Sequence, residues 1–353
     1  MNAESLIAQS SEAREFLADA RKNAPSFLLY PEESFVEFED VCLGGTGTDL
    51  QGERHTLTDI QRVVERIDEG PFWITVHHNP LIHPLGRVLT AKVFYAEGTG
   101  IHFVAALIGR YDPNTFRGLR DQLNPMPQPN LSSDSELDQA EKPYLSFNIF
   151  EIPFSLVKEL IAYAPTIVDN KVAQERRKSA ETVIAILRLV LPAGLLFGMA
   201  KKAGEKVTEL ATEQLFTWIR DTVVKKLSEF RRESQRETLL VLESTVAGCL
   251  IEFVISTRDE YVRIDAARLV DEAFRSSIAI VQHFAEHSPS RLVFAYEEDR
   301  KEWLPLYLVT SRGIFTDRPY LEVIRARGLS LASRGVDNCM EIRDSAAEET
   351  TST

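Results

Sequence analysis

Four of the seven histidines in the chain lie close together, namely His77, His78, His83 and His102. Imidazole side chains can bind a metal ion or act as general bases. A zinc site needs ligands at defined spacings, such as two histidines one helical turn apart, and the prolines of HHNPLIHP exclude a helix here. On a strand, His77 and His78 would point to opposite faces. We therefore expect no metal ion and no cofactor. At most one of His77 and His78 should belong to a site, and His83 should lie on a loop in solvent.

A serine further along the chain offers nucleophilic chemistry. Ser146 lies in PYLSFNIFEI, an apolar segment typical of a strand, which follows a long polar segment with four prolines at residues 124–143. A histidine on a neighbouring strand could act as a general base and activate the serine hydroxyl. The alternative is that Ser146 is only a small residue in a sheet.

The residues around the histidines and the serine resemble one family of enzymes. The segment VHHNPLIHPLGRVLTAKVFYAEGTGIHFVAALIGRYDPNTFRGL and the later YLSFNI are similar to the core of herpesvirus assemblins and phage prohead maturation proteases. The resemblance covers about residues 35–165. The positions that match in order are His78, Gly86, Val88, Gly100, Ile101, Leu145 and Ser146.

This resemblance implies a serine peptidase with His78 as general base and Ser146 as nucleophile. The substrate would be a protein, or the chain itself at its proline-containing loop. Phe147 follows the serine, where the family usually has a small residue. The third catalytic residue has no fixed counterpart, and Glu151 and Asp169 are the candidates.

The elements that would position these residues predict an α+β protein. Residues 1–168 contain helical patterns and strand patterns, and the turn AEGTG between two strand patterns suits a hairpin. Hairpin signals outnumber helical crossovers, so we expect residues 1–168 to form one α+β domain with a mostly antiparallel sheet. The resemblance implies that this domain is prohead-protease-like.

Residues 169–236 form the second expected part, a helical stem. Its segment 183–199, VIAILRLVLPAGLLFGM, is the most apolar in the chain, and Arg188 and Pro192 interrupt it. We expect a buried helix there, with membrane contact through 183–199 as the alternative. The later EKVTELATEQLFTWIRDTVVKKLSEF has one apolar stripe, which is typical of an amphipathic helix.

Residues 237–328 predict a small third module with the element order ββαββ. Two strand patterns precede a helical pattern over 264–286, and two strand patterns follow it. Residues 329–353 end in DSAAEETTST and are expected to form a disordered acidic tail.

Composition restricts the function further. A net charge of −13 argues against nucleic-acid binding. Three scattered cysteines and an N-terminal segment without a signal-peptide core predict a cytoplasmic protein, with membrane association as the alternative. Two functions remain: a serine peptidase, or a non-catalytic interaction or effector protein that oligomerises or contacts membrane through its central helices. Either one implies a protein substrate or partner, and a homo-oligomer is expected.

Overall fold

The chain folds into two compact units. The computed structural model describes residues 3–28, 33–48, 54–75, 79–112, 115–125, 127, 142–148, 151–170, 172–175, 184–192, 213–257, 259–317, 329–331 and 342–344. The first unit comprises Met1–Val76, Ile82–Phe116 and Arg318–Thr353, and the second comprises His77–Leu81 and Arg117–Asp317. Each unit combines helices with a sheet, so the chain is an α+β protein, as expected.

The first unit is built on a four-stranded sheet with the order β1-β4-β3-β2, in which every pairing is antiparallel. This confirms the antiparallel sheet expected at the N-terminus. A tight turn with Gly98 and Gly100 at positive φ joins β3 and β4 as a hairpin. The strands are β1 (Phe35–Gly45), β2 (Phe72–Ile74), β3 (Gly86–Ala96) and β4 (Ile101–Tyr111).

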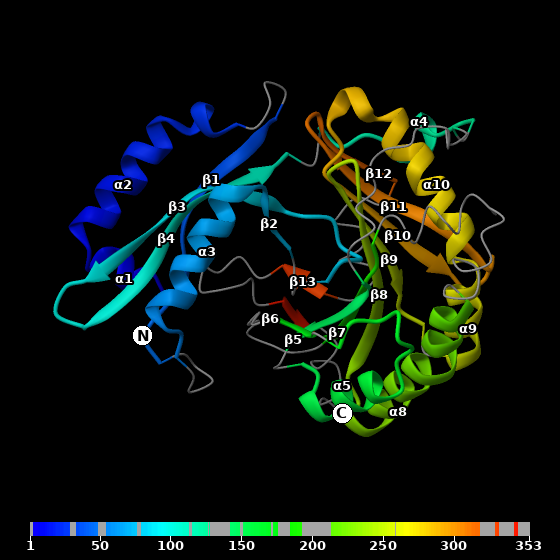
Figure 1. Cartoon of the computed structure of the whole chain (residues 1–353). Coiled ribbons are helices and arrows are strands. Elements are labelled where there is room, and N and C mark those ends of the chain that lie inside the picture. Colours follow the sequence, from blue (N-terminus) through cyan, green and yellow to red (C-terminus); the bar gives the residue numbers. More distant parts are fainter. Residues whose placement is uncertain are drawn as a thin grey trace, which may run out of the picture. The chain divides into compact units, whose positions relative to one another are not determined.

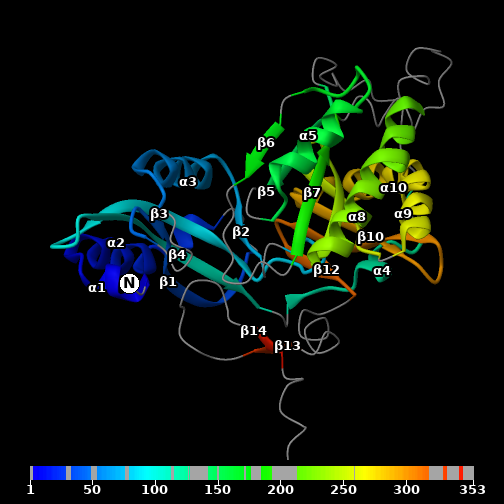
Figure 2. The ribbon, with the colours of Figure 1, turned by 90° about the horizontal axis from the view of Figure 1, so that it is seen from below.

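Helices cover both faces of this sheet (Figure 2). They are α1 (Ala3–Ala8), α2 (Ser11–Lys22), the short 3-10 helix η1 (Ala24–Phe27) and α3 (Leu57–Glu69). Leu6 and Leu17 bury the apolar sides of α1 and α2 against one face. Ile60 and Ile67 of α3 bury theirs against the other. In α2 the buried Leu17 is four residues from Ala13, and in α3 the two isoleucines are seven residues apart; both spacings return a side chain to the same side of a helix.

Gly86, one of the positions matched to the maturation proteases, has a packing role. It opens β3, and a Cβ at this position would collide with the main-chain oxygen of Gly109 on β4. Glycine lets two backbones approach closely, so its presence here is explained by the sheet itself.

The second unit is built on an eight-stranded mixed sheet (Figure 1). Its strand order is β12-β11-β10-β9-β8-β7-β5-β6, with β5–β6, β7–β8 and β9–β10 parallel and the other pairs antiparallel. The strands are β5 (Tyr144–Asn148), β6 (Val172–Glu175), β7 (Ile184–Val190), β8 (Glu237–Val246), β9 (Cys249–Ile255), β10 (Arg291–Glu297), β11 (Glu302–Thr310) and β12 (Gly313–Thr316).

Helices between the parallel strands pack on one face of this sheet (Figure 1). They are α5 (Phe154–Ala162), a helix over 213–234 that contains the π-turn η4 (Ile219–Val223) and α8 (Val224–Ser234), α9 (Glu260–Arg268) and α10 (Val270–His283). The short helices α4 (Leu119–Gln122) and η5 (Ala285–His287) also belong to the unit. Leu187, Leu242 and Phe253 of the sheet meet Phe274 and Ile280 of α10 in one hydrophobic core.

The division between the units differs from the expected boundary near residue 168. Tyr144–Asn148 and Val172–Glu175 belong to the eight-stranded sheet, and the second unit takes in Arg117–Asp317. Strand β5 pairs with β7, which lies some forty positions later in the chain. Such a long-range pairing leaves no signal in local periodicity.

The apolar segment 183–199 is not a helix where the structure describes it. Ile184–Val190 forms β7, buried between β5 and β8. Residues 193–199 lie outside the described part of the chain. A short apolar run suits a buried strand and a buried helix equally, which explains the error. No helix in the described residues is long and apolar enough to span a membrane.

The ββαββ order expected for 237–328 is present, but as part of a larger sheet rather than as a separate module. Strands β8 and β9, the helices α9 and α10, and strands β10 and β11 follow in that order, and β8 continues the sheet to β7. In the expected tail, Leu329–Leu331 (β13) and Ile342–Asp344 (β14) pair as a two-stranded ribbon. The other residues of the tail lie outside the described part.

Candidate functional site

Ser146 lies in the middle of β5, flanked by β6 and β7. It pairs with Ala173 on one side and with Arg188 on the other, and it is 3% exposed. Leu145 and Phe147 point into the helix-covered core, so alternation sends Ser146 to the opposite face of the sheet. Residues directly opposite each other on antiparallel strands share a face. The neighbour of Ser146 on this face is therefore Arg188.

Four charged residues extend across this face of the sheet. Nη1 of Arg188 donates to Oε2 of Glu243 at 3.0 Å and also to Oε1 of Glu252. From the other side, Arg291 donates to Oε2 of Glu252 through Nε at 2.7 Å and Nη2 at 2.5 Å. Arg188, Glu252 and Arg291 are all buried. We call Arg188, Glu243, Glu252 and Arg291 the arginine–glutamate row.

Strand register explains why the arginine–glutamate row exists. Glu243 of β8 stands directly opposite Glu252 of β9, and like charges in that position repel. Arg188 approaches from β7 and Arg291 from β10, so two positive charges offset the two negative ones. Buried charges persist only when they are paired in this way.

None of these four residues is among the predicted site residues, although the sequence carries a signal for them. ILRLV and LIEFV each place one charge inside an apolar strand pattern, and RLVFAY begins such a pattern with a charge. A charge in the middle of a buried strand must find an opposite charge nearby. Two strand patterns that contain opposite charges can therefore be predicted to lie near each other in the sheet.

The arginine–glutamate row is suited to holding strands together. Burial alone raises the pKa of the Glu252 carboxyl, but the charges of Arg291 and Arg188 and their hydrogen bonds lower it more. The resulting pKa lies well below the ordinary glutamate value, so the carboxylate stays ionised at neutral pH. A group with so little affinity for a proton is a poor general base.

The depressed pKa of Glu252 predicts a loss of stability in acid. Its folded-state pKa is below the unfolded value, so its contribution to the free energy of unfolding is fully present above about pH 4.3. The contribution falls as the pH drops through that value toward the folded-state pKa. Urea unfolding at a series of pH values should show a shallower acid dependence for Glu252→Gln than for the wild type. The exposed Glu286→Gln should retain the wild-type slope; equal slopes for all three proteins would contradict the prediction.

The histidine cluster is only partly described. His77 and His78 lie outside the described residues, so the pairing of His78 with Ser146 stays a prediction. His102 is half-buried on β4, and its ring packs against Tyr95 of β3 in the first unit. Its neighbour on the adjacent strand thus accounts for its position.

His83 is buried, which corrects the expectation that it lies in solvent. It is 3% exposed, its Nδ1 lies 3.0 Å from the carbonyl oxygen of Pro84, and its ring packs edge-on against Phe116. Burial lowers the pKa of His83, and the hydrogen bond to Pro84 offsets part of that effect. The expectation failed because the apolar neighbour Ile82 is also buried and holds this segment inside the protein.

Of the two candidates for the third catalytic residue, Glu151 has a clear structural contact. It is buried, and its Oε2 accepts a hydrogen bond from the main-chain N–H of Ile186 in β7 at 3.2 Å. Asp169 is tied through its main-chain N–H to the carbonyl oxygen of Pro143 at 2.7 Å. These contacts anchor the loops at either end of α5 to the sheet.

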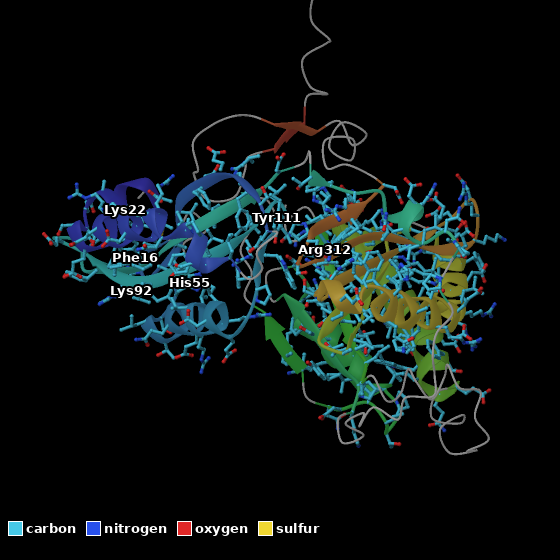
Figure 3. All side chains as sticks on the ribbon, turned by 90° about the horizontal axis from the view of Figure 1, so that it is seen from above. Phe16, Lys22, His55, Lys92, Tyr111 and Arg312 are labelled. Carbon is cyan, nitrogen blue, oxygen red and sulfur yellow. The ribbon has the colours of Figure 1, made fainter. Side chains whose placement is uncertain are left out.

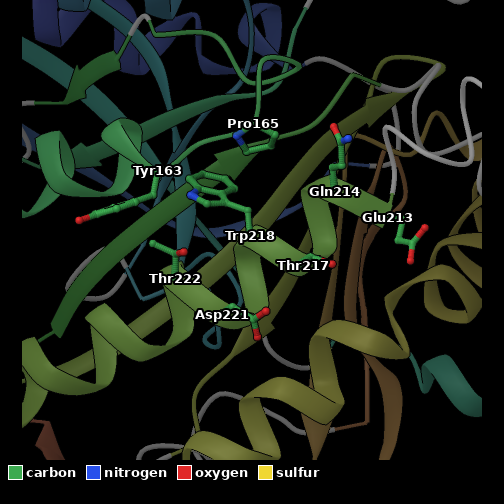
Figure 4. A pocket seen from close by; sticks show the side chains of 8 residues that line it. All are labelled: Tyr163, Pro165, Glu213, Gln214, Thr217, Trp218, Asp221 and Thr222. Carbon is green, nitrogen blue, oxygen red and sulfur yellow. The ribbon is translucent and has the colours of Figure 1, made fainter.

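A groove of about 500 Å³ lies on the second unit, between the end of α5 and the helix over 213–234 (Figure 4). Its lining residues are Tyr163, Pro165, Glu213, Gln214, Thr217, Trp218, Asp221 and Thr222. Trp218 is buried and donates its indole N–H to the carbonyl oxygen of Leu160 at 3.1 Å. The carboxylate of Asp221 accepts two hydrogen bonds from the guanidinium group of Arg220. Ser146 is not part of this groove.

Among the described residues, no group of three or more His, Cys, Asp or Glu side chains is placed to hold a metal ion. No family model, curated protein or solved structure matches the chain. Its geometry is therefore the basis for a functional proposal.

Proposed function

We propose that this chain is a non-catalytic interaction protein. The observation that carries the proposal is the position of Ser146, which is 3% exposed on a strand flanked on both sides and faces Arg188. A serine nucleophile needs room for a peptide carbonyl and a base within hydrogen-bond reach. On the two strands that flank β5, the described residues include no histidine.

The segment after the histidine pair supports the same proposal. Tyr307 of β11 donates its hydroxyl to the carbonyl oxygen of Pro80 at 3.0 Å. In the sheet, β11 is five strands away from β5, a separation of about 24 Å at the usual strand spacing. Two residues of extended chain reach only about 7 Å. A base near Pro80 is thus poorly placed to serve Ser146.

The competing serine peptidase can be tested by covalent labelling with a fluorophosphonate probe. We expect the wild type, Ser146→Ala and His78→Gln to give the same background signal, because the buried hydroxyl of Ser146 is inaccessible to the probe. His77→Gln is the matched control for the histidine pair. Labelling of the wild type that disappears in Ser146→Ala and His78→Gln, but persists in His77→Gln, would establish the peptidase and overturn the proposal.

A further inference from the structure

We propose that a groove on the first unit binds an acidic amphipathic helix of a partner protein. The groove, of about 520 Å³, lies between α1, α2 and β1. Its walls include Ile7 of α1, Arg14, Ala18, Arg21 and Lys22 of α2, and Asp40 of β1. The inference rests on the proposed function in one respect, namely that the protein acts by binding.

The charged side chains of the groove differ in whether they already have a partner within the protein. Arg21 donates through Nη1 to the carbonyl oxygen of Phe38 at 2.7 Å and through Nη2 to Asp40 at 2.9 Å, so it ties α2 to β1 and neutralises the one acid in the wall. The side chain of Arg14 is exposed and makes no hydrogen bond or ion pair with any other described residue. Among the described residues, the side chain of Lys22 (Figure 3) contacts only Asp19, in an exposed ion pair at 3.3 Å that contributes little. Two positive charges therefore remain for an occupant.

The distance between the positive charges of Arg14 and Lys22 indicates which kind of structure can bind in the groove. Arg14 and Lys22 are eight residues apart on α2, or about 12 Å along its axis. Between them the groove presents the small Ala18 and the apolar Ile7, which allow close helix packing. A helix with carboxylates seven or eight positions apart and a leucine-like residue between them matches this surface. Binding of an amphipathic helix in a groove is a common mode of recognition.

An anionic membrane surface fits the same residues less well. Helices that lie on membranes have a broad cationic face. The exposed residues of α2 also include Glu12, Glu15 and Asp19, which would repel anionic lipid. A partner helix meets only the groove and avoids these acids.

Fluorescence anisotropy with a synthetic helical peptide tests the inference. The probe carries glutamates at positions one and eight with leucines between them, and its control carries lysines in place of the glutamates. We expect the full-length protein to bind the glutamate peptide only, and more weakly as salt is raised. Arg14→Glu should lower the affinity about tenfold, because it replaces an attraction by a repulsion at the rim. Arg62→Glu, which alters an exposed arginine on α3 of the same unit, should leave the affinity unchanged.

Several outcomes would overturn the inference. Equal affinity for both peptides, or equal effects of Arg14→Glu and Arg62→Glu, would show that the groove is not the binding site. Binding to phosphatidylserine vesicles that is lost in Arg14→Glu would identify a membrane surface instead, and self-association lost in that variant would identify a second copy. Ala18→Glu, a second substitution at an exposed position of the wall, should also weaken binding. With this second variant the test remains decisive if Arg14→Glu misfolds. The outcome for Ser146 labelling is independent, so failure of the proposed function and failure of this inference are distinguishable.

Discussion

Replacement of Glu252 by leucine is expected to lower the free energy of unfolding of the second unit by about 3–5 kcal/mol. The substitution removes the carboxylate that Arg188 and Arg291 share and leaves the ion pair of Arg188 with the partly exposed Glu243 in place. Two guanidinium groups in the sheet would then have lost the charge between them. The cost comes from these uncompensated cations more than from any loss of packing, because leucine is close in size to glutamate.

Chemical denaturation followed by tryptophan fluorescence measures this effect, since Trp218 and Trp303 both adjoin the core of the second unit. Glu302→Leu is the matched control. Glu302 lies on β11 of the same sheet, but its pair with Arg300 is exposed and contributes at most about 1 kcal/mol.

A combined variant separates charge from packing in the same experiment. When Arg188→Met and Arg291→Met accompany Glu252→Leu, much of the lost stability should return, because no uncompensated cation remains. A Glu252→Leu protein as stable as Glu302→Leu would show that the arginine–glutamate row does not hold the sheet together.

The elements that sequence patterns predict well are those whose contacts are local. The hairpin of β3 and β4 follows from the alternation of apolar and polar residues and from a glycine turn. The order of β8, β9, the helices and β10 follows from the change between strand and helix periodicity of the apolar residues. The joining of these pieces is not local. β7 pairs in parallel with β8 across the helix over 213–234, and periodicity contains no information about that pairing.

The candidate site shows the same limit. YLSFN was predicted as a strand, and it is β5. The residues that surround Ser146 depend on which strands pair with β5, and the local sequence does not specify that pairing. From the sequence alone, Arg188 interrupts an apolar segment that predicts a helix, whereas in β7 it pairs with carboxylates on β8 and β9. A charge inside an apolar segment has these two explanations, and only the pairing of strands distinguishes them.

The second large effect is expected from Ile280→Asp, which should unfold the entire second unit. Ile280 of α10 is fully buried, in a core that also contains residues of α5, of the helix over 213–234 and of the sheet from β5 to β12. An unpaired carboxylate there loses its hydration and gains no partner, so we expect a destabilisation of more than about 4 kcal/mol. A separate module at 237–328 would confine the damage to itself. A continuous sheet would not.

The two tryptophans of the second unit distinguish these possibilities. Trp303 lies on β11 inside residues 237–328, whereas Trp218 lies on the earlier helix. In a Trp73→Phe background, which removes the third tryptophan of the chain, Ile280→Asp should expose both remaining indoles together. Gln282→Asp, an exposed position two residues along α10, should leave both in their native environment. Should Trp303 become exposed while Trp218 keeps its native emission, β8 and the strands beyond it would fold independently of β5 and β7, and the eight-stranded sheet would not be one cooperative unit.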